Sequence, residues 1–579
     1  MEKIKGFLNK KHSWILLGII FLGIFLRVYN FAPWIHFELD QARDAILIDE
    51  AIDGGMGELT LLGPRAAGTM LRLGPAFYYL EYIGSVITGN TIVGSAGVVL
   101  FFSILSLPLF YVFLRRYFSE RISLSLLAVF STSLFLVTYS RFAWNPNLIP
   151  FFMLVVMYSL LRTVEAEEKK KGKWLVLTAV FFSLLVQFHF LALIISSGVA
   201  VLFLLYKRPK IQLKFWVAAV AVFFFVSSPM IINDIKTGGD NFSEFMGAVT
   251  EKSDESPVPL IEKLARNYSE HSFWHEVILT GYQDSDLPKL EKKKKGGYGV
   301  ECDRYCRDHL VAGMLGFLIV TLGGILLIWR AFKEKHSIKK DFLVINLLVL
   351  FVSFVIFTPL SLDLSPRFFL IEIAIPFVFL GLIFENMKSI KGGKLLIAPA
   401  AAILVIFNIS FVEIFFNELS VAGKENTEIG RDRILKQKTR ITLEQQMAII
   451  EYFKERYNEN GYPIFLRGQN EFHRSFSYLL DKEGIFRDGI STTTIYEEGN
   501  YFLIVRSQSS MDSFQEKYGE KFEFTSKEEF GTLSVFGLSP KKDAITNKSF
   551  DLKELEKERD DEEDNGSEDA KRYKWNEIF

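Results

Sequence analysis

The chain has 579 residues, half of them hydrophobic, and a formal net charge of −1. This balance gives no electrostatic reason to expect a nucleic-acid partner, and two cysteines are too few for a disulfide-rich scaffold. The apolar residues come in blocks of about 20, which is the length that crosses roughly 30 Å of hydrocarbon. The sequence therefore predicts an all-α polytopic membrane protein.

Eleven apolar blocks are predicted to span the membrane. The first begins near Ser13 and has no small-residue cleavage site behind it, so we expect a retained anchor rather than a signal peptide. The run from Trp174 to Tyr206 is too long for one helix and is divided into a helical hairpin at 190/191. The predicted spans are residues 13–31, 91–113, 122–140, 147–164, 174–190, 191–206, 214–232, 310–330, 341–360, 367–386 and 393–416.

The connecting segments differ in basic charge, which predicts their orientation. The short turns on one side of the membrane contain a single basic residue, Arg141. The segments on the other side hold 24 Lys and Arg in total, in residues 1–12, 115–121, 162–173, 207–214, 330–340 and 387–394. We therefore expect a multi-pass protein of the cell (plasma) membrane with a cytoplasmic N-terminus. Long external segments then follow at residues 32–90, at 233–309 and after about 417.

The C-terminal part is predicted to fold outside the membrane. Residues 445–457 have helical periodicity, whereas 463–466 and 501–505 are strand-like. We expect a transmembrane domain over 1–416, a small extracytoplasmic α/β domain over 417–541, and a charged, disordered tail over 542–579.

The first external loop, residues 32–90, contains two amphipathic stretches. Residues 41–53 and 75–87 both suit helices that lie in the plane of the membrane interface. Glycine and proline residues interrupt the chain between them. This arrangement would hold the start of the loop near the level of the lipid head groups.

The sequence Phe37-Glu-Leu-Asp40-Gln-Ala-Arg43-Asp44-Ala45 directly follows the first predicted span. A carboxylate and a guanidinium three residues apart, where the chain leaves the bilayer, are well placed for polar chemistry on a lipid head group. Asp is also a favoured N-cap, and a helix is predicted to begin at Gln41. The two roles of Asp40 are compatible.

This motif and the topology resemble the GT-C glycosyltransferases, in the branch of protein O-mannosyltransferases and the lipid A aminoarabinose transferase (PMT/ArnT-like). The resemblance covers most of residues 10–416. It implies a GT-C fold that moves a sugar, with inversion, from a polyprenyl-phosphate carrier to an extracytoplasmic acceptor, with Asp40 as the general base. The family usually has Asp-Glu where this chain has Asp40-Gln41, and Arg72-Leu73-Gly74-Pro75 replaces its Lys-Pro-Pro signature. These departures leave open which cation meets the phosphate.

Four arginines on the predicted outer side are candidates for binding the donor phosphate, because Arg stays charged and binds phosphate in a fork. Each could instead extend its charged end to the membrane interface. A monophosphate leaving group can be handled without a metal, and no metal-ligand spacing is present, so we expect no cofactor besides the lipid-linked donor. The candidates are Arg43, Arg72, Arg141 and Arg367.

Other polar or aromatic residues at the outer ends of the predicted spans could line the same site. They could equally be solvated charges, helix caps or members of an aromatic belt. These residues are Glu38, Asp44, Trp144, Asn145 and His189. Cys302 and Cys306 lie outside, and both a local disulfide and two free thiols are compatible with their spacing.

Two other functions are alternatives to the glycosyltransferase. A transporter or flippase of lipid-linked sugars would favour internal repeats, broken helices and charges near mid-membrane. A membrane-anchored binding protein would not need eleven spans. The expected partners are membrane lipid, a polyprenyl-phosphate sugar and an acceptor that could be a protein, a lipid or a cell-surface glycan, which the C-terminal domain would help to bind.

Overall fold

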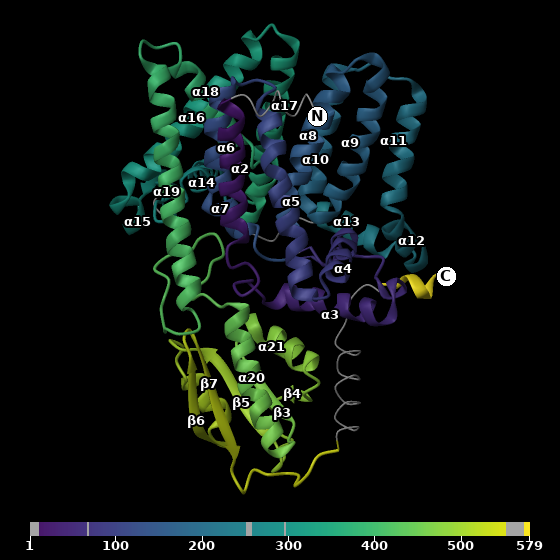
Figure 1. Ribbon diagram of the computed structural model, residues 1–579, viewed down its shortest axis with the longest axis vertical. Coiled ribbons are helices and arrows are strands. Elements are labelled where there is room, and N and C mark those ends of the chain that lie inside the picture. Colours follow the sequence, from purple (N-terminus) through teal and green to yellow (C-terminus); the bar gives the residue numbers. More distant parts are fainter. Residues whose placement is uncertain (1–10, 67–68, 251–257, 294–296, 552–571) are drawn as a thin grey trace.

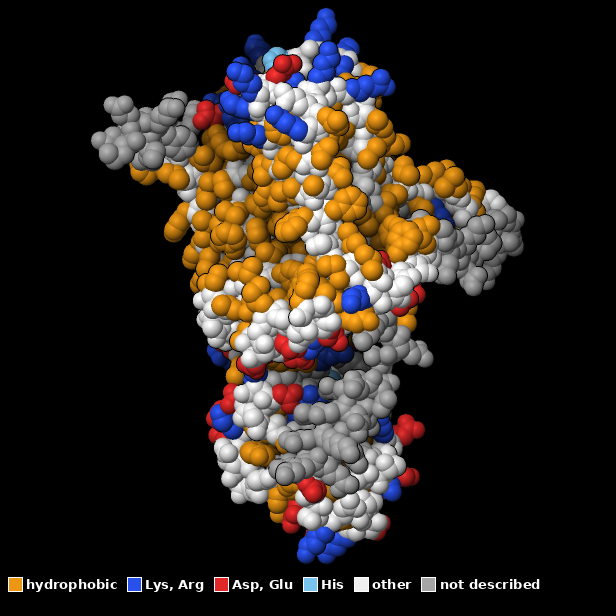
Figure 2. Space-filling view, turned by 90° about the vertical axis from the view of Figure 1, so that its right-hand side faces the viewer, with side chains coloured by type: hydrophobic (Ala, Val, Ile, Leu, Met, Phe, Trp, Pro, Cys, Tyr) orange, Lys and Arg blue, Asp and Glu red, His pale blue; other side chains and the backbone are white. Residues whose placement is uncertain are grey.

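The computed structural model describes residues 11–66, 69–250, 258–293, 297–551 and 572–579. The chain forms a long helical bundle, and a smaller α/β region lies below one end of it (Figure 1). The space-filling view shows a broad hydrophobic band across this face of the bundle, with Lys and Arg gathered at the end opposite the α/β region (Figure 2). This pattern is typical of a protein that exposes apolar side chains to lipid.

Helices occupy each of the predicted spans, although not all of them are long and apolar enough to cross a membrane alone. Seven described helical stretches meet both criteria. Their bounds are α5 (Thr91–Leu114), η2 with α8 (Asn145–Leu148 and Ile149–Glu165), α9 (Glu168–Phe188), α10 (Phe190–Lys207), α16 (Leu310–Lys333), α17 (Ser337–Phe357) and α19 (Gly393–Val421). The predicted division near 190 falls between α9 and α10.

The other predicted spans are shorter or broken. The first and tenth correspond to α2 (Lys11–Val28), whose apolar part is short, and α18 (Ile375–Met387). The seventh is bent by 60° between its two halves. The third and seventh are divided into α6 (Glu120–Thr132) and α7 (Leu134–Tyr139), and into α11 (Leu213–Val226) and α12 (Ser228–Thr237). The count of eleven spans and the cytoplasmic N-terminus therefore remain predictions.

The break between α6 and α7 has a clear physical cause. Ser133 Oγ donates a hydrogen bond to the carbonyl of Ile278, and the backbone N–H of Leu134 donates to Asn408 Oδ1. Both Ser133 and Asn408 are fully buried. The Asn408 side chain thus accepts from a backbone N–H that a continuous helix would have paired with its own carbonyl.

The segment that was predicted to be the second external loop contains a buried helix, α14 (Leu260–Thr280), packed between α16 and α18. Its polar residues lower its mean hydropathy, so the sequence did not predict a buried helix here. The Nε2 atoms of His271 and His275 lie 3.2 and 3.6 Å from Glu372 Oε1, and all three side chains are buried. Mutual pairing is what allows such polar groups to be buried. The remaining elements are α13 (Asp240–Thr250), β1 (Lys289–Lys292), β2 (Tyr298–Glu301) and α15 (Arg304–Asp308).

The first loop forms α3 (Leu39–Gly54), η1 (Met56–Glu58) and α4 (Ala76–Thr88), at the two places where helices were predicted. Helix α3 lies across the end of the bundle that faces the α/β region (Figure 1). Its Asp49 accepts a hydrogen bond from Tyr478 at 2.8 Å and pairs with Lys482 at 2.7 Å. The first loop is thus held between the bundle and the C-terminal region.

The C-terminal region is a five-stranded sheet in the order β4-β3-β5-β7-β6. Strands β4, β3 and β5 are parallel, whereas β7 pairs antiparallel with β5 and β6. This mixture fits the α/β pattern that the sequence predicts. The bounds are α20 (Leu443–Asn460), β3 (Ile464–Gly468), α21 (Asn470–Lys482), β4 (Arg487–Gly489), β5 (Asn500–Arg506), α22 (Asp512–Tyr518), β6 (Phe522–Phe530) and β7 (Leu533–Pro540).

Two described parts of the tail differ from the prediction of disorder. Ala544 is buried against the sheet, and Asn547 forms a β-bridge with Tyr496. Residues 572–579, which include η4 (Trp575–Glu577), return to the first loop, where the C-terminus lies beside α3 and α4 (Figure 1). The rest of the predicted tail, 552–571, lies outside the described residues.

Candidate functional site

Asp40 lies in the first turn of α3 and is not its N-cap. The cap is Glu38, whose backbone N–H donates to Gln41 Oε1 at 3.1 Å. The capping role considered for Asp40 is therefore wrong. With its side chain 45% exposed, the Asp40 carboxylate remains accessible to a ligand.

Gln41, the departure from the family's Asp-Glu pair, connects α3 to the bundle. Its Oε1 accepts the bond from Glu38, while its Nε2 donates to the carbonyl of Ala143 at 2.9 Å. A carboxylate could not make this donation. The amide thus fixes the start of α3 against the turn that carries Trp144.

Arg43 joins two carboxylates. Its Nη1 lies 3.0 Å from Asp40 Oδ1 and its Nη2 lies 2.7 Å from Asp44 Oδ1. Asp44 is almost fully buried, at 1% exposure, so the pair anchors the guanidinium. Arg43 therefore orients Asp40, and most of its donors are occupied within α3.

Trp144 brings Asp40 near a second arginine. Its Nε1 donates to Asp40 Oδ2 at 3.1 Å, and the Arg367 guanidinium lies 5.0 Å from the centroid of the same indole. Arg367 stands on the 3-10 turn η3 (Pro366–Leu370) that precedes α18. Among the described residues it has no carboxylate partner within ion-pair distance, unlike Arg43. It is thus the cation in this cluster that is available to an anionic ligand.

Asn145 and His189 hold the neighbouring turn between α9 and α10. Asn145 Nδ2 donates to the carbonyl of Phe188, and His189 Nδ1 accepts from the backbone N–H of Leu191 at 3.1 Å. The His189 ring packs edge-on against Phe368, 5.6 Å between centroids. Both residues are helix-end partners in this structure, and they place the turn beside Arg367.

Arg72 lies in a separate apolar groove of about 440 Å³. The groove is bounded by the first loop, the α9–α10 turn, α11, α12 and α13, and its lining includes Gln187 and Phe190 from that turn. The side chain of Asn241 bonds the backbone N–H and carbonyl of Arg72 at 2.8 and 3.1 Å. The groove and the Asp40 cluster therefore both border the α9–α10 turn.

Arg141, the fourth candidate, does not join this cluster. Its Nη1 donates to the carbonyl of Arg27 at 2.9 Å and its Nη2 donates to that of Asn30 at 3.1 Å. The rings of Phe31 and Phe416 flank the guanidinium. The side chain completes the C-terminal end of α2, as expected for a cation at a helix C-terminus.

We therefore expect Arg141→Lys to lower stability without weakening the binding of a phosphate ligand. Lysine cannot reach both carbonyls in a fork, and losing a charge-assisted hydrogen bond costs about 1.5–3 kcal/mol. Thermal unfolding in detergent would measure the loss. If Arg141→Lys left thermal unfolding unchanged but lost affinity for phosphate, Arg141 would instead be a residue of the binding site.

The remaining candidate, Glu38, contacts the segment that connects α19 to the sheet. Gln437 Nε2 donates to Glu38 Oε1 at 3.1 Å, and His36 Nδ1 lies 3.6 Å from the same oxygen. This connecting segment thus borders the approach to Asp40.

Two buried residues near Arg43 were not predicted from the sequence as site residues. They are Tyr78 and Glu81. Both stand on α4 and are fully buried. Burial raises the pKa of Glu81 well above its ordinary value, and the charge of Asp44 adds to the effect. A lone carboxylate among the aromatic residues of an amphipathic stretch is the signal that could have identified Glu81.

Burial raises the pKa of Asp44 from 3.8 to about 6, against the opposing effect of Arg43. The folded state therefore binds this proton more tightly than the unfolded chain, so the free energy of unfolding should fall as pH rises from about 4 to 6 and then level off. Asp44→Asn should remove this part of the pH dependence. Thermal unfolding at pH 4.5 and 7 compares the two proteins, and an identical slope in both would contradict the assignment.

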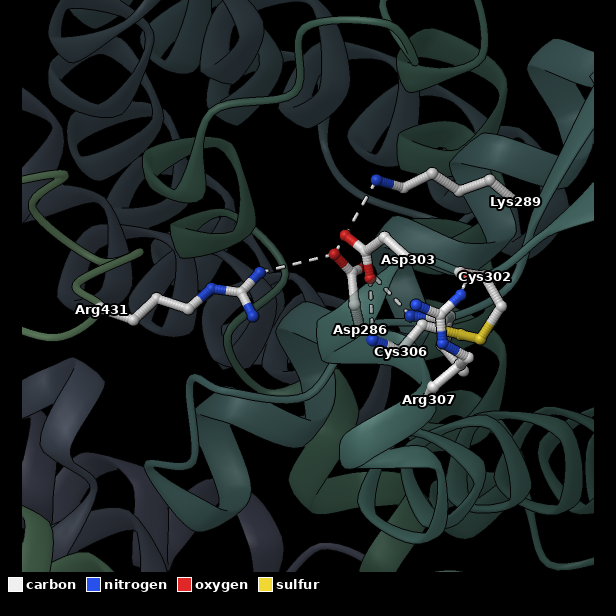
Figure 3. Close-up of a disulfide and its surroundings, with 8 residues drawn as sticks. Asp286, Lys289, Cys302, Asp303, Cys306, Arg307 and Arg431 are labelled. Carbon is white, nitrogen blue, oxygen red and sulfur yellow. Dashed lines mark hydrogen bonds and ion pairs between the residues drawn. A yellow bond between two sulfur atoms is a disulfide. The ribbon is translucent and has the colours of Figure 1, made fainter.

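Cys302 and Cys306 form a disulfide, the first of the two alternatives left open by the sequence (Figure 3). Nearby, Asp286 pairs with Arg431 at 3.4 Å and Lys289 at 3.8 Å. Disulfides persist in oxidising compartments, so the bond fits an extracytoplasmic segment. In the described parts of the chain, no group of three His, Cys, Asp or Glu residues is arranged to hold a metal.

Part of the chain matches a family of known proteins, and its fold matches solved structures. Residues 73–232 match the family model of dolichyl-phosphate-mannose-protein mannosyltransferase. The solved structure of ArnT from Cupriavidus metallidurans in the apo state is 11% identical, with a TM-score of 0.50 over 90% of this chain and 97% of that chain. The same protein bound to undecaprenyl phosphate is 9% identical, with a TM-score of 0.52 over 91% and 97%. No curated protein sequence gives a significant match.

The fold is thus that of a multi-pass membrane protein of the GT-C class. The predicted resemblance to the PMT/ArnT-like superfamily of GT-C glycosyltransferases is confirmed by the family match and the shared fold.

Proposed function

We propose that the protein is an integral-membrane glycosyltransferase that moves a sugar from a polyprenyl-phosphate donor to an extracytoplasmic acceptor. The observation that carries the proposal is the Asp40–Trp144–Arg367 cluster. One indole contacts both an accessible carboxylate and a guanidinium without a carboxylate partner in the described structure. A base and a phosphate-binding cation are the two groups that this reaction needs.

Asp40 would act as the general base. The acceptor hydroxyl oxygen attacks the anomeric carbon and gives its proton to Asp40. The bond from that carbon to the phosphate oxygen breaks with its electron pair, and polyprenyl phosphate leaves. A single displacement of this kind inverts the anomeric centre. Arg43, whose guanidinium pairs with the Oδ1 atom of Asp40, would hold this side chain in position.

Arg367 would stabilise the charge on the departing phosphate. The groove that contains Arg72 would hold the isoprenoid, because its lining is predominantly apolar. ArnT, which shares the fold, has been solved with undecaprenyl phosphate. Arg72 would then meet the phosphate from the groove side, and no metal or other cofactor is required.

The acceptor would approach from the side of the C-terminal region. The segment that bears Gln437 touches Glu38, two residues from Asp40, and helix α21 of the C-terminal region packs on α3. We therefore expect this region to help bind the acceptor, whether that is a protein, a lipid or a cell-surface glycan. A plasma-membrane protein with its N-terminus in the cytoplasm would place the whole site outside.

Proteoliposomes of known sidedness test the proposal. Donor and acceptor supplied on the face that carries the C-terminal sheet should give transfer and free polyprenyl phosphate, whereas supply on the other face should not. A flippase would instead move the intact donor across the bilayer without cleaving it.

A further inference from the structure

We propose that the C-terminal segment Arg572–Phe579 is a strap that holds the two walls of the Arg72 groove together. The inference deepens the proposed function, because it rests on that groove as the donor site. One wall is the first loop, residues 71–74, and the other is formed by α12 and α13. In Figure 1 the C-terminus lies against these elements, far from the sheet that precedes it in the sequence.

The strap pairs with the chain beside a hairpin. The second arm of this hairpin, residues 71–74, is one wall of the groove. Gly63 N–H donates to the carbonyl of Leu73, and Leu73 N–H donates to that of Pro64, so residues 63–66 pair with 71–73. Lys574 forms an antiparallel bridge with Thr60, in the segment that leads directly into this hairpin. Pairing of an extended segment with an exposed strand is a common mode of peptide recognition.

One residue of the strap joins the segment before the hairpin to α12. The carbonyl of Tyr573 accepts a hydrogen bond from Leu61 N–H at 2.8 Å, while its N–H donates to Asn233 Oδ1 on α12 at 3.0 Å. Asn233 is buried, at 1% exposure. The neighbouring Asp234 lines the groove and bonds the backbone N–H of Phe242 on α13 at 3.1 Å. The strap therefore connects the hairpin to the opposite wall.

Side chains of the strap make the docking specific. Lys574 Nζ lies 3.0 Å from Glu50 and 2.9 Å from Glu58. Trp575 Nε1 donates to Tyr79 Oη at 2.9 Å, and Tyr79 donates to the carbonyl of Thr60 at 3.1 Å. A basic and aromatic segment thus meets an acidic and aromatic surface, and this surface is the partner site of the chain's own C-terminus.

Spin labels at Met70→Cys and Ile235→Cys would report the separation of the two walls. Both positions are exposed, at 40% and 75%, and the native cysteines are paired with each other. We expect a narrow distance distribution in the full chain and a broad one when residues 572–579 are deleted. A synthetic peptide of residues 572–579 should narrow it again. An unchanged distribution after the deletion would overturn the strap.

Affinity for undecaprenyl phosphate, measured with the purified unlabelled protein, tests the link to the groove. A groove that is closed only a tenth of the time would bind undecaprenyl phosphate about tenfold more weakly. We expect this loss of affinity for the deletion and for Lys574→Glu. Lys542→Glu, the same charge change at an exposed site on the sheet region, should have no effect. Broadened distances with unchanged affinity would overturn the role at the groove. If the full chain does not bind the probe, the donor site itself is wrong, and the spin labels still decide whether the strap exists.

Discussion

Asp40→Asn is expected to lower kcat for sugar transfer by about 100- to 10,000-fold, the range that a positioned general base contributes. Asparagine keeps the shape of the side chain and can still accept from Trp144 Nε1, but it cannot take the proton of the acceptor. The affinity for undecaprenyl phosphate should change little, because Arg367 and the groove remain. Initial rates with a polyprenyl-phosphate donor, together with direct binding of the lipid, separate the two effects.

Asp53→Asn provides a matched control for this variant. Asp53 lies near the other end of α3 and is exposed. The substitution removes the same charge from the same helix and should leave kcat within about twofold, the scale of a surface change below 0.5 kcal/mol. If both variants lose activity equally, the effect belongs to the charge of the loop and not to Asp40.

Arg367→Gln is expected to weaken the binding of the donor phosphate by about 10- to 150-fold. This range corresponds to the loss of a charged hydrogen bond worth about 1.5–3 kcal/mol. Arg367 has no carboxylate partner among the described residues, so removing it leaves no opposite charge unpaired, and the fold should tolerate the change. Binding of undecaprenyl phosphate measures the effect, and thermal unfolding checks the fold.

Arg304→Gln is the corresponding control, since the Arg304 side chain is 86% exposed and lies between the two cysteines of the disulfide. Its lipid affinity should equal that of the wild type. If Arg367→Gln binds the lipid normally while Arg72→Gln does not, the phosphate lies at the groove and the role of Arg367 is wrong.

The apolar blocks predicted helices at the correct places because a lipid-facing helix must be apolar over its whole length. Hydropathy could not predict the features that depend on buried polar pairs. The break at Ser133 needs Asn408, nearly three hundred residues away, and α14 is buried because two histidines meet Glu372. Both are long-range arrangements that no local window contains.

At the site, too, a local contact could be predicted from the sequence, whereas long-range contacts could not. The spacing of Asp40 and Arg43 on one helix predicts their contact, which the structure shows at 3.0 Å. The placement of Arg141 and Arg367 could not be predicted in this way. Both lie at helix ends that are predicted to face outward and look alike in sequence, yet Arg141 is held by carbonyls of the first helix and Arg367 faces Trp144. The sequence did not predict the strap, because the charged composition of the tail indicates disorder although it contains Tyr573 and Trp575.

The most direct test of the central claim follows a radiolabelled sugar on undecaprenyl phosphate in reactions with purified protein and cell-envelope acceptors. The mechanism predicts one free undecaprenyl phosphate for each sugar transferred by the wild type, with the anomeric centre inverted, and almost none with Asp40→Asn. Equal turnover by the wild type and Asp40→Asn would contradict the assignment of the base. A donor that stays intact in the presence of wild-type protein, across all sugars and acceptors tried, would contradict the proposed function itself.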